Sequence, residues 1–113
     1  MVSTETVRQL ALAFPETEEL PHFHLTSFRV KKKIFTTMDE KLGRVMVKLN
    51  LKDQSVFCSF DKTIIYPVPG GWGRMGCTFV NLEKVRKSML KDAMTAAYCT
   101  VAPPKLAEKF LPK

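Results

Sequence analysis

The residues with the most distinctive chemistry lie in a glycine-rich segment, residues 66–80, which holds four of the chain's five glycines and its only tryptophan. Within it, residues 71–76 match G-x-G-x-x-G, the pattern whose backbone amides hold a pyrophosphate where a strand leads into a helix. Here Pro67 and Pro69 precede the pattern and a β-favouring run follows it, so that context is missing. We therefore expect a glycine-rich turn that joins two strands, with Trp72 closing over the sheet.

A second candidate is a run of basic residues on a predicted hairpin tip and the strands beside it. Lys31, Lys32 and Lys33 are consecutive, and mobile point charges of this kind suit contact with successive phosphates. The alternative is a turn that only keeps the protein in solution. Three further bases are expected on the solvent face of adjacent strands and would widen the patch; they are Arg29, Arg44 and Lys48.

Arg74 beside Trp72 puts a cation next to a flat aromatic ring on the glycine-rich turn. Such a pair can contact a phosphate or stack on a base. The alternative is a Trp72 packed in the core with Arg74 in water. With His22, these two residues are also candidates for a pocket that holds a small anionic ligand. Binding to nucleic acid should be mostly to phosphate and weakly sequence-specific, because no segment reads as a recognition helix for the major groove.

The histidines do not predict a metal site. His22 and His24 are spaced so that both rings fall on one face of a strand, and two ligands could come from them. A third would have to come from Glu18 or Glu19, and the sheet around them is basic. We therefore predict no metal and no cofactor.

Catalysis is not predicted either. The cysteines at 58, 77 and 99 form no C-x-x-C pair, so we expect reduced structural thiols rather than a nucleophile beside a base. The acids Glu16, Glu18 and Glu19 are most simply a solvated linker. We therefore expect a protein that is not an enzyme.

Composition and charge narrow the class of protein. A chain of 113 residues with 45% hydrophobic content predicts one domain, 1–113, with a true core and no internal repeat. Its apolar runs are too short to span a bilayer and no secretory signal is apparent, which predicts a cytoplasmic protein. The net charge of +7 is uneven, because residues 1–28 are acidic whereas residues 29–52 and 83–113 hold most of the basic excess. A polyanion-binding face would need such a block.

Hydrophobic periodicity predicts an α+β fold with helices packed on one face of an antiparallel sheet of about five strands. The expected order is helix, three strands, helix, two strands, helix. Ser3 or Thr4 should cap the first helix, Asp53 the second and Asn81 the last, whose apolar stripe is Leu82, Val85, Met89, Ala93 and Ala97. The expected strands are 26–30, 34–38, 44–51, 62–68 and 72–80, with residues 16–21 as a linker and 105–113 as a turn of helix or a frayed tail.

Several segments together resemble the MmcQ/YjbR family. They are Leu20-Pro21-His22-Phe23, Ser27-Phe28-Arg29-Val30, Lys33-Ile34-Phe35, Val47-Lys48-Leu49, Gly71-Trp72-Gly73, Gly76-Cys77-Thr78, Ala97-Tyr98 and Ala102-Pro103. The resemblance runs from about Phe14 to Pro103. It implies a frataxin (CyaY-like) fold without established catalysis, in which two hairpins have been proposed as a "double wing" that binds DNA. The wings would lie around residues 31–33 and 70–76.

We therefore expect a non-catalytic, cytoplasmic protein that binds DNA without sequence specificity through two basic wings. Two alternatives remain open: a protein-interaction module that uses the exposed sheet, and a pocket for a small anionic ligand near Trp72. A contiguous apolar patch would favour the first, and a concave pocket with convergent polar groups the second. The sequence does not fix the oligomeric state.

Overall fold

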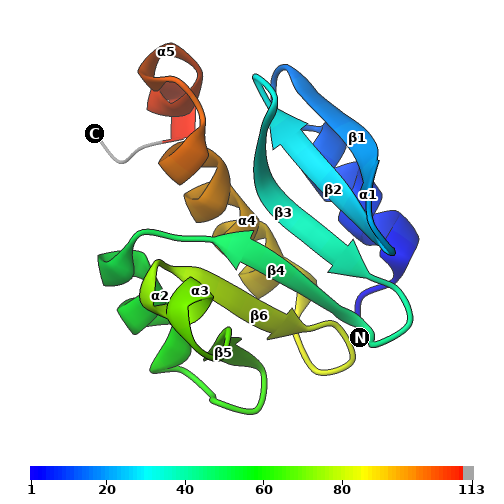
Figure 1. Cartoon of the computed structure of the whole chain (residues 1–113), viewed down its shortest axis with the longest axis vertical. Helices are drawn as coiled ribbons and strands as arrows, with labels where there is room; N and C mark the ends of the chain where they lie inside the picture. Colours follow the sequence, from blue (N-terminus) through cyan, green and yellow to red (C-terminus); the bar gives the residue numbers. More distant parts are fainter. Residues whose placement is uncertain (111–113) are drawn as a thin grey trace.

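A computed structural model of the chain describes residues 1–110 (Figure 1). Its strands are β1 (Thr17–His22), β2 (Leu25–Val30), β3 (Lys33–Asp39), β4 (Arg44–Lys48), β5 (Ile65–Pro67) and β6 (Cys77–Asn81). Its helices are α1 (Thr4–Leu12), α2 (Leu51–Cys58), α3 (Gly71–Arg74), α4 (Lys87–Val101) and α5 (Pro104–Ala107), followed by a 3₁₀ turn, Glu108–Phe110. The predicted α+β class is confirmed, but the antiparallel sheet has six strands rather than about five.

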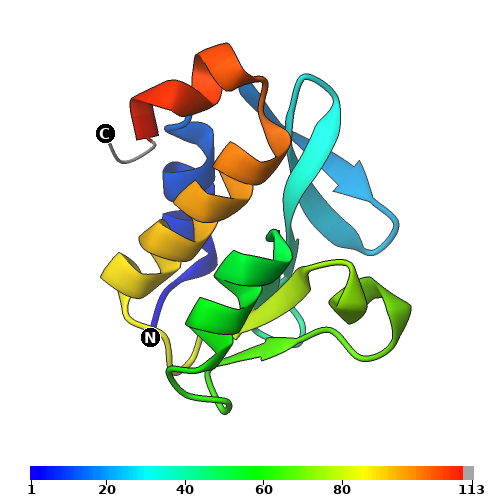
Figure 2. The same ribbon diagram turned by 90° about the vertical axis from the view of Figure 1, so that its left-hand side faces the viewer.

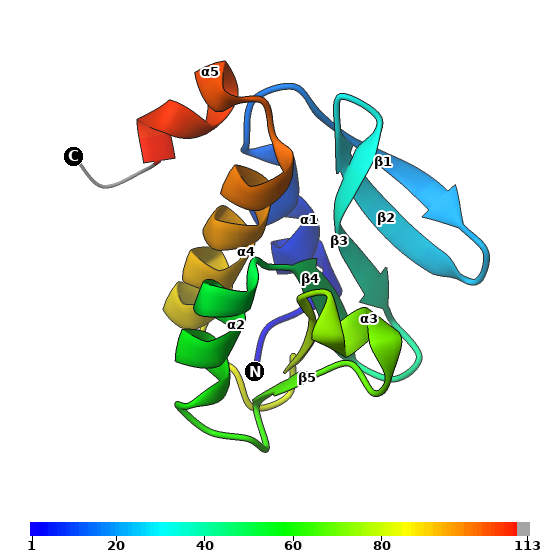
Figure 3. The ribbon, with the colours of Figure 1, turned by 60° about the vertical axis from the view of Figure 1, so that its left-hand side comes forward.

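The strands lie in the order β1-β2-β3-β4-β6-β5, and every neighbouring pair is antiparallel. Helix α1 packs on β1, α4 on β3 and β4, and α2 on β5. Figures 2 and 3 show α1, α2 and α4 on one side of the sheet and the short helix α3 on the other. We call the side that carries α3 the open face, because α1, α2 and α4 all leave it uncovered.

The additional strand is β1, which occupies most of the segment predicted as an acidic linker. It pairs with β2 along its whole length, from Thr17 opposite Val30 to His22 opposite Leu25. Most of its side chains are exposed, so it lacks the apolar alternation that identifies a strand in a sequence. It lies at the edge of the sheet, where Pro21 is tolerated.

The core lies between the sheet and the long helices. Tyr98 of α4 is fully buried and stacks on Phe14 with ring centroids 4.8 Å apart, and its hydroxyl donates to the carbonyl of Pro15 at 2.8 Å. The same burial raises the pKa of Tyr98. This contact joins the last long helix to the end of the first, 83 residues apart in sequence.

The predicted start of the last helix was wrong. Helix α4 begins at Lys87 with Arg86 at its N-cap, while Leu82 and Val85 are buried in the preceding loop. Asn81 instead ends β6, where it pairs with Arg44. The buried face of α4 is Leu90, Ala93, Met94, Ala97 and Tyr98.

The predicted cap of the second helix was also wrong by three residues. Asn50 caps α2, since its side-chain oxygen accepts from the backbone amide of Asp53 at 2.8 Å. The strand expected to reach Leu51 consequently ends at Lys48. The buried face also differs from our expectation, because Val56 is exposed whereas Gln54 is buried.

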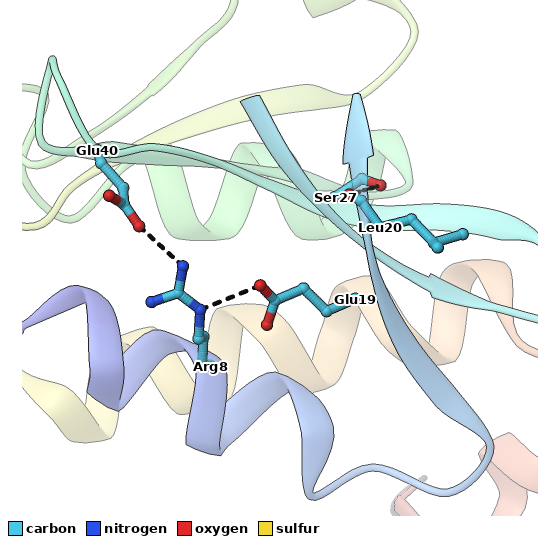
Figure 4. Close-up of polar contacts among 5 residues, drawn as sticks. All are labelled: Arg8, Glu19, Leu20, Ser27 and Glu40. Atoms are coloured by element: carbon cyan, nitrogen blue, oxygen red, sulfur yellow. Dashed lines mark hydrogen bonds and ion pairs between the residues drawn. The ribbon is translucent and has the colours of Figure 1, made fainter. Parts of the chain in front are cut away.

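An ion-pair bridge fixes α1 against the sheet (Figure 4). Arg8 donates to Glu19 of β1 at 3.1 Å and to Glu40, just after β3, at 2.9 Å, and these hydrogen bonds raise its pKa. Figure 4 also shows the Ser27 hydroxyl donating to the carbonyl of Leu20 at 2.8 Å, which adds a side-chain bond to the β1–β2 pairing. The ion pairs are partly exposed, so they orient α1 more than they stabilise it.

The C-terminal tail is helical as far as it is described. Pro104 occupies the first turn of α5, where a missing amide proton costs nothing, and the 3₁₀ turn ends at Phe110. The last part of the predicted tail, residues 111–113, lies outside the described residues. Across residues 1–110, no helix has the length and apolar character needed to cross a bilayer.

Candidate functional site

The predicted hairpin around Lys31 to Lys33 is confirmed. Lys31 and Lys32 form a two-residue turn between β2 and β3, both with positive φ (50° and 69°), and Lys33 begins β3. Turns of this kind match the twist of the flanking strands. All three side chains are exposed, and Lys31 forms an ion pair with Glu16. Among residues 1–110, Lys32 and Lys33 make no ion pair, so their charges remain available.

The glycine-rich segment joins β5 to β6, which pair antiparallel as the predicted second hairpin requires, but it contains a helical turn and the two strands are shorter than predicted. Residues 71–74 form α3, and β6 begins only at Cys77. Trp72 is 68% exposed, so neither the core packing nor the closure over the sheet expected for it occurs. Met75 is 63% exposed and Arg74 is also exposed. The second wing therefore presents an indole, a thioether and a guanidinium to solvent.

Close backbone contacts explain why this segment is compact. A Cβ atom on Gly73 would lie 1.8 Å from the carbonyl oxygen of Val68, and one on Gly76 would lie 1.8 Å from that of Leu49. Gly76 also has φ +106°, which side-chain-bearing residues rarely adopt. The two glycines let α3 pack directly on backbone.

Gln54 holds the segment from beneath, and sequence reasoning missed it. Its side-chain amide is buried and donates to the carbonyl of Gly73 at 2.8 Å, to that of Cys77 at 3.3 Å and to the hydroxyl of Thr78 at 3.2 Å. With Asp53 taken as the cap, Gln54 would lie in the first turn, where a polar residue needs no explanation. Asn50 is a typical N-cap residue, and a helix predicted to start there would have placed Gln54 beyond the first turn, where a buried polar side chain needs a partner.

The two wings leave the same end of the sheet. The register pairs Val30 with Lys33 where β2 ends and β3 begins, and Lys48 with Cys77 where β4 ends and β6 begins. Since β3 and β4 are antiparallel, these pairs lie at one end of the sheet. We call it the lysine end. Its bases are Arg29, Lys31, Lys32, Lys33, Lys48 and Arg74, and the acids in and beside β1 are Glu16 and Glu18.

Alternation along β2 and β4 puts Arg29, Arg44 and Lys48 on the open face, as predicted, because Phe28, Val45 and Val47 between them are buried. Lys48 donates to the carbonyl of Met75 at 3.1 Å, so the end of α3 rests on it. Arg29 donates to the hydroxyl of Ser27 at 3.0 Å. The backbone carbonyl and the hydroxyl bear no charge, so these contacts fix both side chains without neutralising them.

Arg44 lies apart from the other bases, near the opposite end of β4. Its guanidinium carbon is 3.9 Å from the centroid of the Phe79 ring, a cation–π contact, and its Nε is buried without a hydrogen-bond partner. An uncharged row crosses the sheet between Arg44 and Lys48. This row consists of the directly paired residues Leu20, Ser27, Thr37, Met46, Phe79 and Tyr66. The basic surface is therefore concentrated at the lysine end and does not cover the open face continuously.

The structure does not bring His22 to Trp72 and Arg74. His22 is the last residue of edge strand β1, at the end of the sheet opposite the lysine end, whereas α3 follows β5 at the other edge. A pocket of about 540 Å³ does exist, but it lies elsewhere, between Phe60, Ile64 and the start of α4, and is not lined by any of the three.

The expected pair of histidines on a strand face does not form either. His22 ends β1, while His24 lies in the two-residue turn after Phe23, which has φ 57°. Within residues 1–110, no three His, Cys, Asp or Glu side chains come together as a metal site.

The cysteines are packed rather than activated. Cys77 is buried in β6, and burial raises the pKa of both Cys58 and Cys99. Burial disfavours the thiolate, which is the reactive form. This agrees with the prediction of structural thiols.

Comparison with known proteins identifies the family. The YjbR family model matches residues 12–100. The crystal structure of Deinococcus radiodurans protein DR2400, which carries a DUF419 domain, superposes with a TM-score of 0.79 at 17% identity, covering 99% of this chain and 91% of that one. At this identity the likeness shows a common fold. No curated protein matches the chain. Because the family model spans most of the sequence, the chain belongs to the YjbR family.

Proposed function

We propose that this protein binds nucleic acid, through phosphate contacts at the lysine end of its sheet, as a non-catalytic protein of the cytoplasm. In this proposal the first wing is residues 31–33, the turn between β2 and β3 together with Lys33, and the second wing is residues 70–76, the glycine-rich segment that contains α3. Binding of this kind is electrostatic and weakly sequence-specific, since phosphate contacts position a protein without reading bases.

One observation carries the proposal: two segments about 40 residues apart in sequence leave the sheet at the same end, and each carries exposed cations. Lys32 and Lys33 on the first wing and Arg74 on the second make no ion pair among residues 1–110. Arg29 and Lys48 lie on the strands that join the wings. A polyanion along this end could neutralise several of these charges together.

Salt dependence of binding tests the proposal. Fluorescence anisotropy of labelled 15-nucleotide DNA, duplex and single-stranded, should give affinities that fall steeply between about 50 and 200 mM salt. Contact with about three to five phosphates implies a log–log slope of roughly −2 to −4.5. The variant Lys31/Lys32/Lys33→Gln should bind more weakly and lose about two units of slope, because Lys31 is already paired with Glu16.

A matched control removes the same charge elsewhere. Lys87, Lys91 and Lys105 are exposed on α4 and α5, away from the open face, and the variant Lys87/Lys91/Lys105→Gln has the same net charge as the first. It should keep nearly wild-type affinity. Equal losses in the two variants would mean that the lysine end is not the interface, and absence of binding at 50 mM salt would overturn the function itself.

Protein interaction through the same surface is the second candidate. Its support is the exposure of Trp72 and Met75, since exposed apolar side chains often mark partner surfaces. Association of this kind buries apolar area, so it should be nearly insensitive to salt and to the lysine substitutions. Sedimentation of the protein alone, at low and high salt, would reveal a self-association with those properties.

A further inference from the structure

The exposure of Trp72 is not explained by folding. The indole is 68% exposed, so it contributes little to the core. Yet the backbone beneath it is held rigidly by the Gln54 hydrogen bonds and by the packing of Gly73 on Val68. The backbone that carries this large flat side chain is therefore pre-organised to meet a ligand, so that binding has to order only the two side-chain torsions.

Other aromatic residues on the open face are less accessible. Tyr66 and Phe79 pack on each other with ring centroids 5.7 Å apart, and Arg44 covers one face of Phe79. Both are only partly exposed. Within residues 1–110, Trp72 therefore has a larger free surface than the aromatic residues of the neighbouring strands β5 and β6.

We propose that Trp72 stacks on an unpaired base, so that the ligand of this protein is single-stranded nucleic acid. The inference rests on the proposed function. Cations that follow a phosphate backbone, combined with an exposed aromatic side chain, are typical of proteins that bind single strands. A duplex covers its bases, and stacking on one would require intercalation with partial unstacking. Trp72 gains its full contact only with a base that is not paired.

The surroundings of Trp72 agree with this ligand. Arg74 lies two residues on, and Lys48 is fixed beneath the segment by its bond to the carbonyl of Met75. The cations of the first wing lie at the same end of the sheet. A strand whose base rests on Trp72 can therefore place its neighbouring phosphates near positive charge, and every base has a face on which an indole can stack.

Intrinsic fluorescence gives a direct test, because Trp72 is the only tryptophan. Titration with dT15 and with rU15, which have little structure of their own, should quench the emission, while a 15-base-pair duplex should quench it much less. The two single strands also separate a DNA ligand from an RNA ligand. By anisotropy, Trp72→Ala should weaken dT15 binding by about 5- to 100-fold, leave duplex binding almost unchanged and preserve the salt slope. Trp72→Phe should fall between.

The matched control is Phe23→Ala. Phe23 is 91% exposed, also aromatic, and lies in the β1–β2 turn at the opposite end of the sheet. This variant should bind dT15 as the wild type does. Far-ultraviolet circular dichroism checks that each variant is folded, which is expected because both side chains are exposed.

The outcomes separate the two proposals. Salt-dependent binding that Trp72→Ala leaves unchanged, or that occurs without quenching, would overturn the stacking inference and leave the electrostatic function standing. Equal losses for dT15 and the duplex would overturn it as well. Absence of any binding by the wild-type protein at 50 mM salt would overturn both.

Discussion

Alanine substitutions at two glycines of α3 should change stability in opposite directions. Gly71 and Gly73 are two residues apart and neither has a positive φ, so alanine suits the backbone at both. Their surroundings differ. A Cβ on Gly71 would meet only the Arg74 side chain at 4.0 Å, whereas one on Gly73 would lie 1.8 Å from the carbonyl oxygen of Val68.

The magnitudes follow from this geometry. Gly71→Ala should gain about 0.5 kcal/mol, because alanine loses less backbone entropy than glycine in a helix. For Gly73→Ala, real Cβ atoms essentially never come closer than 3.0 Å, so α3 and the Val68 backbone must separate by about 1.2 Å or more. That movement strains packing by about 1–3 kcal/mol and weakens the bond from Gln54 to Gly73, worth about 1 kcal/mol. The net loss is about 2–4 kcal/mol.

Urea unfolding followed by circular dichroism at 222 nm measures both changes. With a slope of about 1.5–2 kcal/mol/M, the Gly73→Ala midpoint should fall by about 1–2.7 M, while that of Gly71→Ala rises slightly. Similar losses in both variants, or a Gly73→Ala protein as stable as the wild type, would show that α3 does not pack on Val68. The pre-organisation of Trp72 would then lose its structural basis.

Two further predictions concern buried groups and pH. In Gln54→Glu, burial and the carbonyls of Gly73 and Cys77 should raise the carboxyl pKa above its unfolded value of about 4.3, so the folded state keeps a proton that the unfolded state releases. Its stability relative to wild type should therefore fall as the pH rises from about 4 to 8, and a deficit independent of pH in urea unfolding would contradict this. The Tyr98 hydroxyl donates to the carbonyl of Pro15, so the wild type should be more stable than Tyr98→Phe by about 1 kcal/mol at pH 7. Burial raises the pKa of Tyr98 above its ordinary value of 10.0, so this advantage should shrink above pH 10. A constant difference up to pH 11 would mean that Tyr98 titrates alike in the folded and unfolded chains.

The sequence predicted the structure correctly where the buried side chains follow the two-residue period of a strand. The apolar residues of β2 and β4 alternate, so the hairpin at Lys31 to Lys33 and the outward direction of Arg44 and Lys48 could be predicted. These features depend on the period of a strand, which a local pattern records.

The errors arose where tertiary contacts decide the structure. The turn predicted for the glycine-rich segment, with Trp72 closing over the sheet, is instead a short helix that leaves the indole exposed. The position of α3 depends on Gln54, Val68 and Leu49, which lie outside the G-x-G-x-x-G pattern. Likewise, β1 is held by pairing with β2 rather than by apolar residues of its own. Neither contact leaves a periodic signal.

The candidate site depends on the register of the strands. The sequence could therefore predict which residues belong to the site, but not that they lie at one end of the sheet. Each base of the lysine end could be predicted from its own strand or turn. Their convergence requires that β4 run antiparallel to both β3 and β6, so that the end of β4 lies between the two wings. A slip of one residue in β4 would turn Lys48 inward and remove the side chain on which α3 rests. The burial of Val45 and Val47 therefore does more than stabilise the core, because it also places Lys48 on the side of the sheet that carries α3.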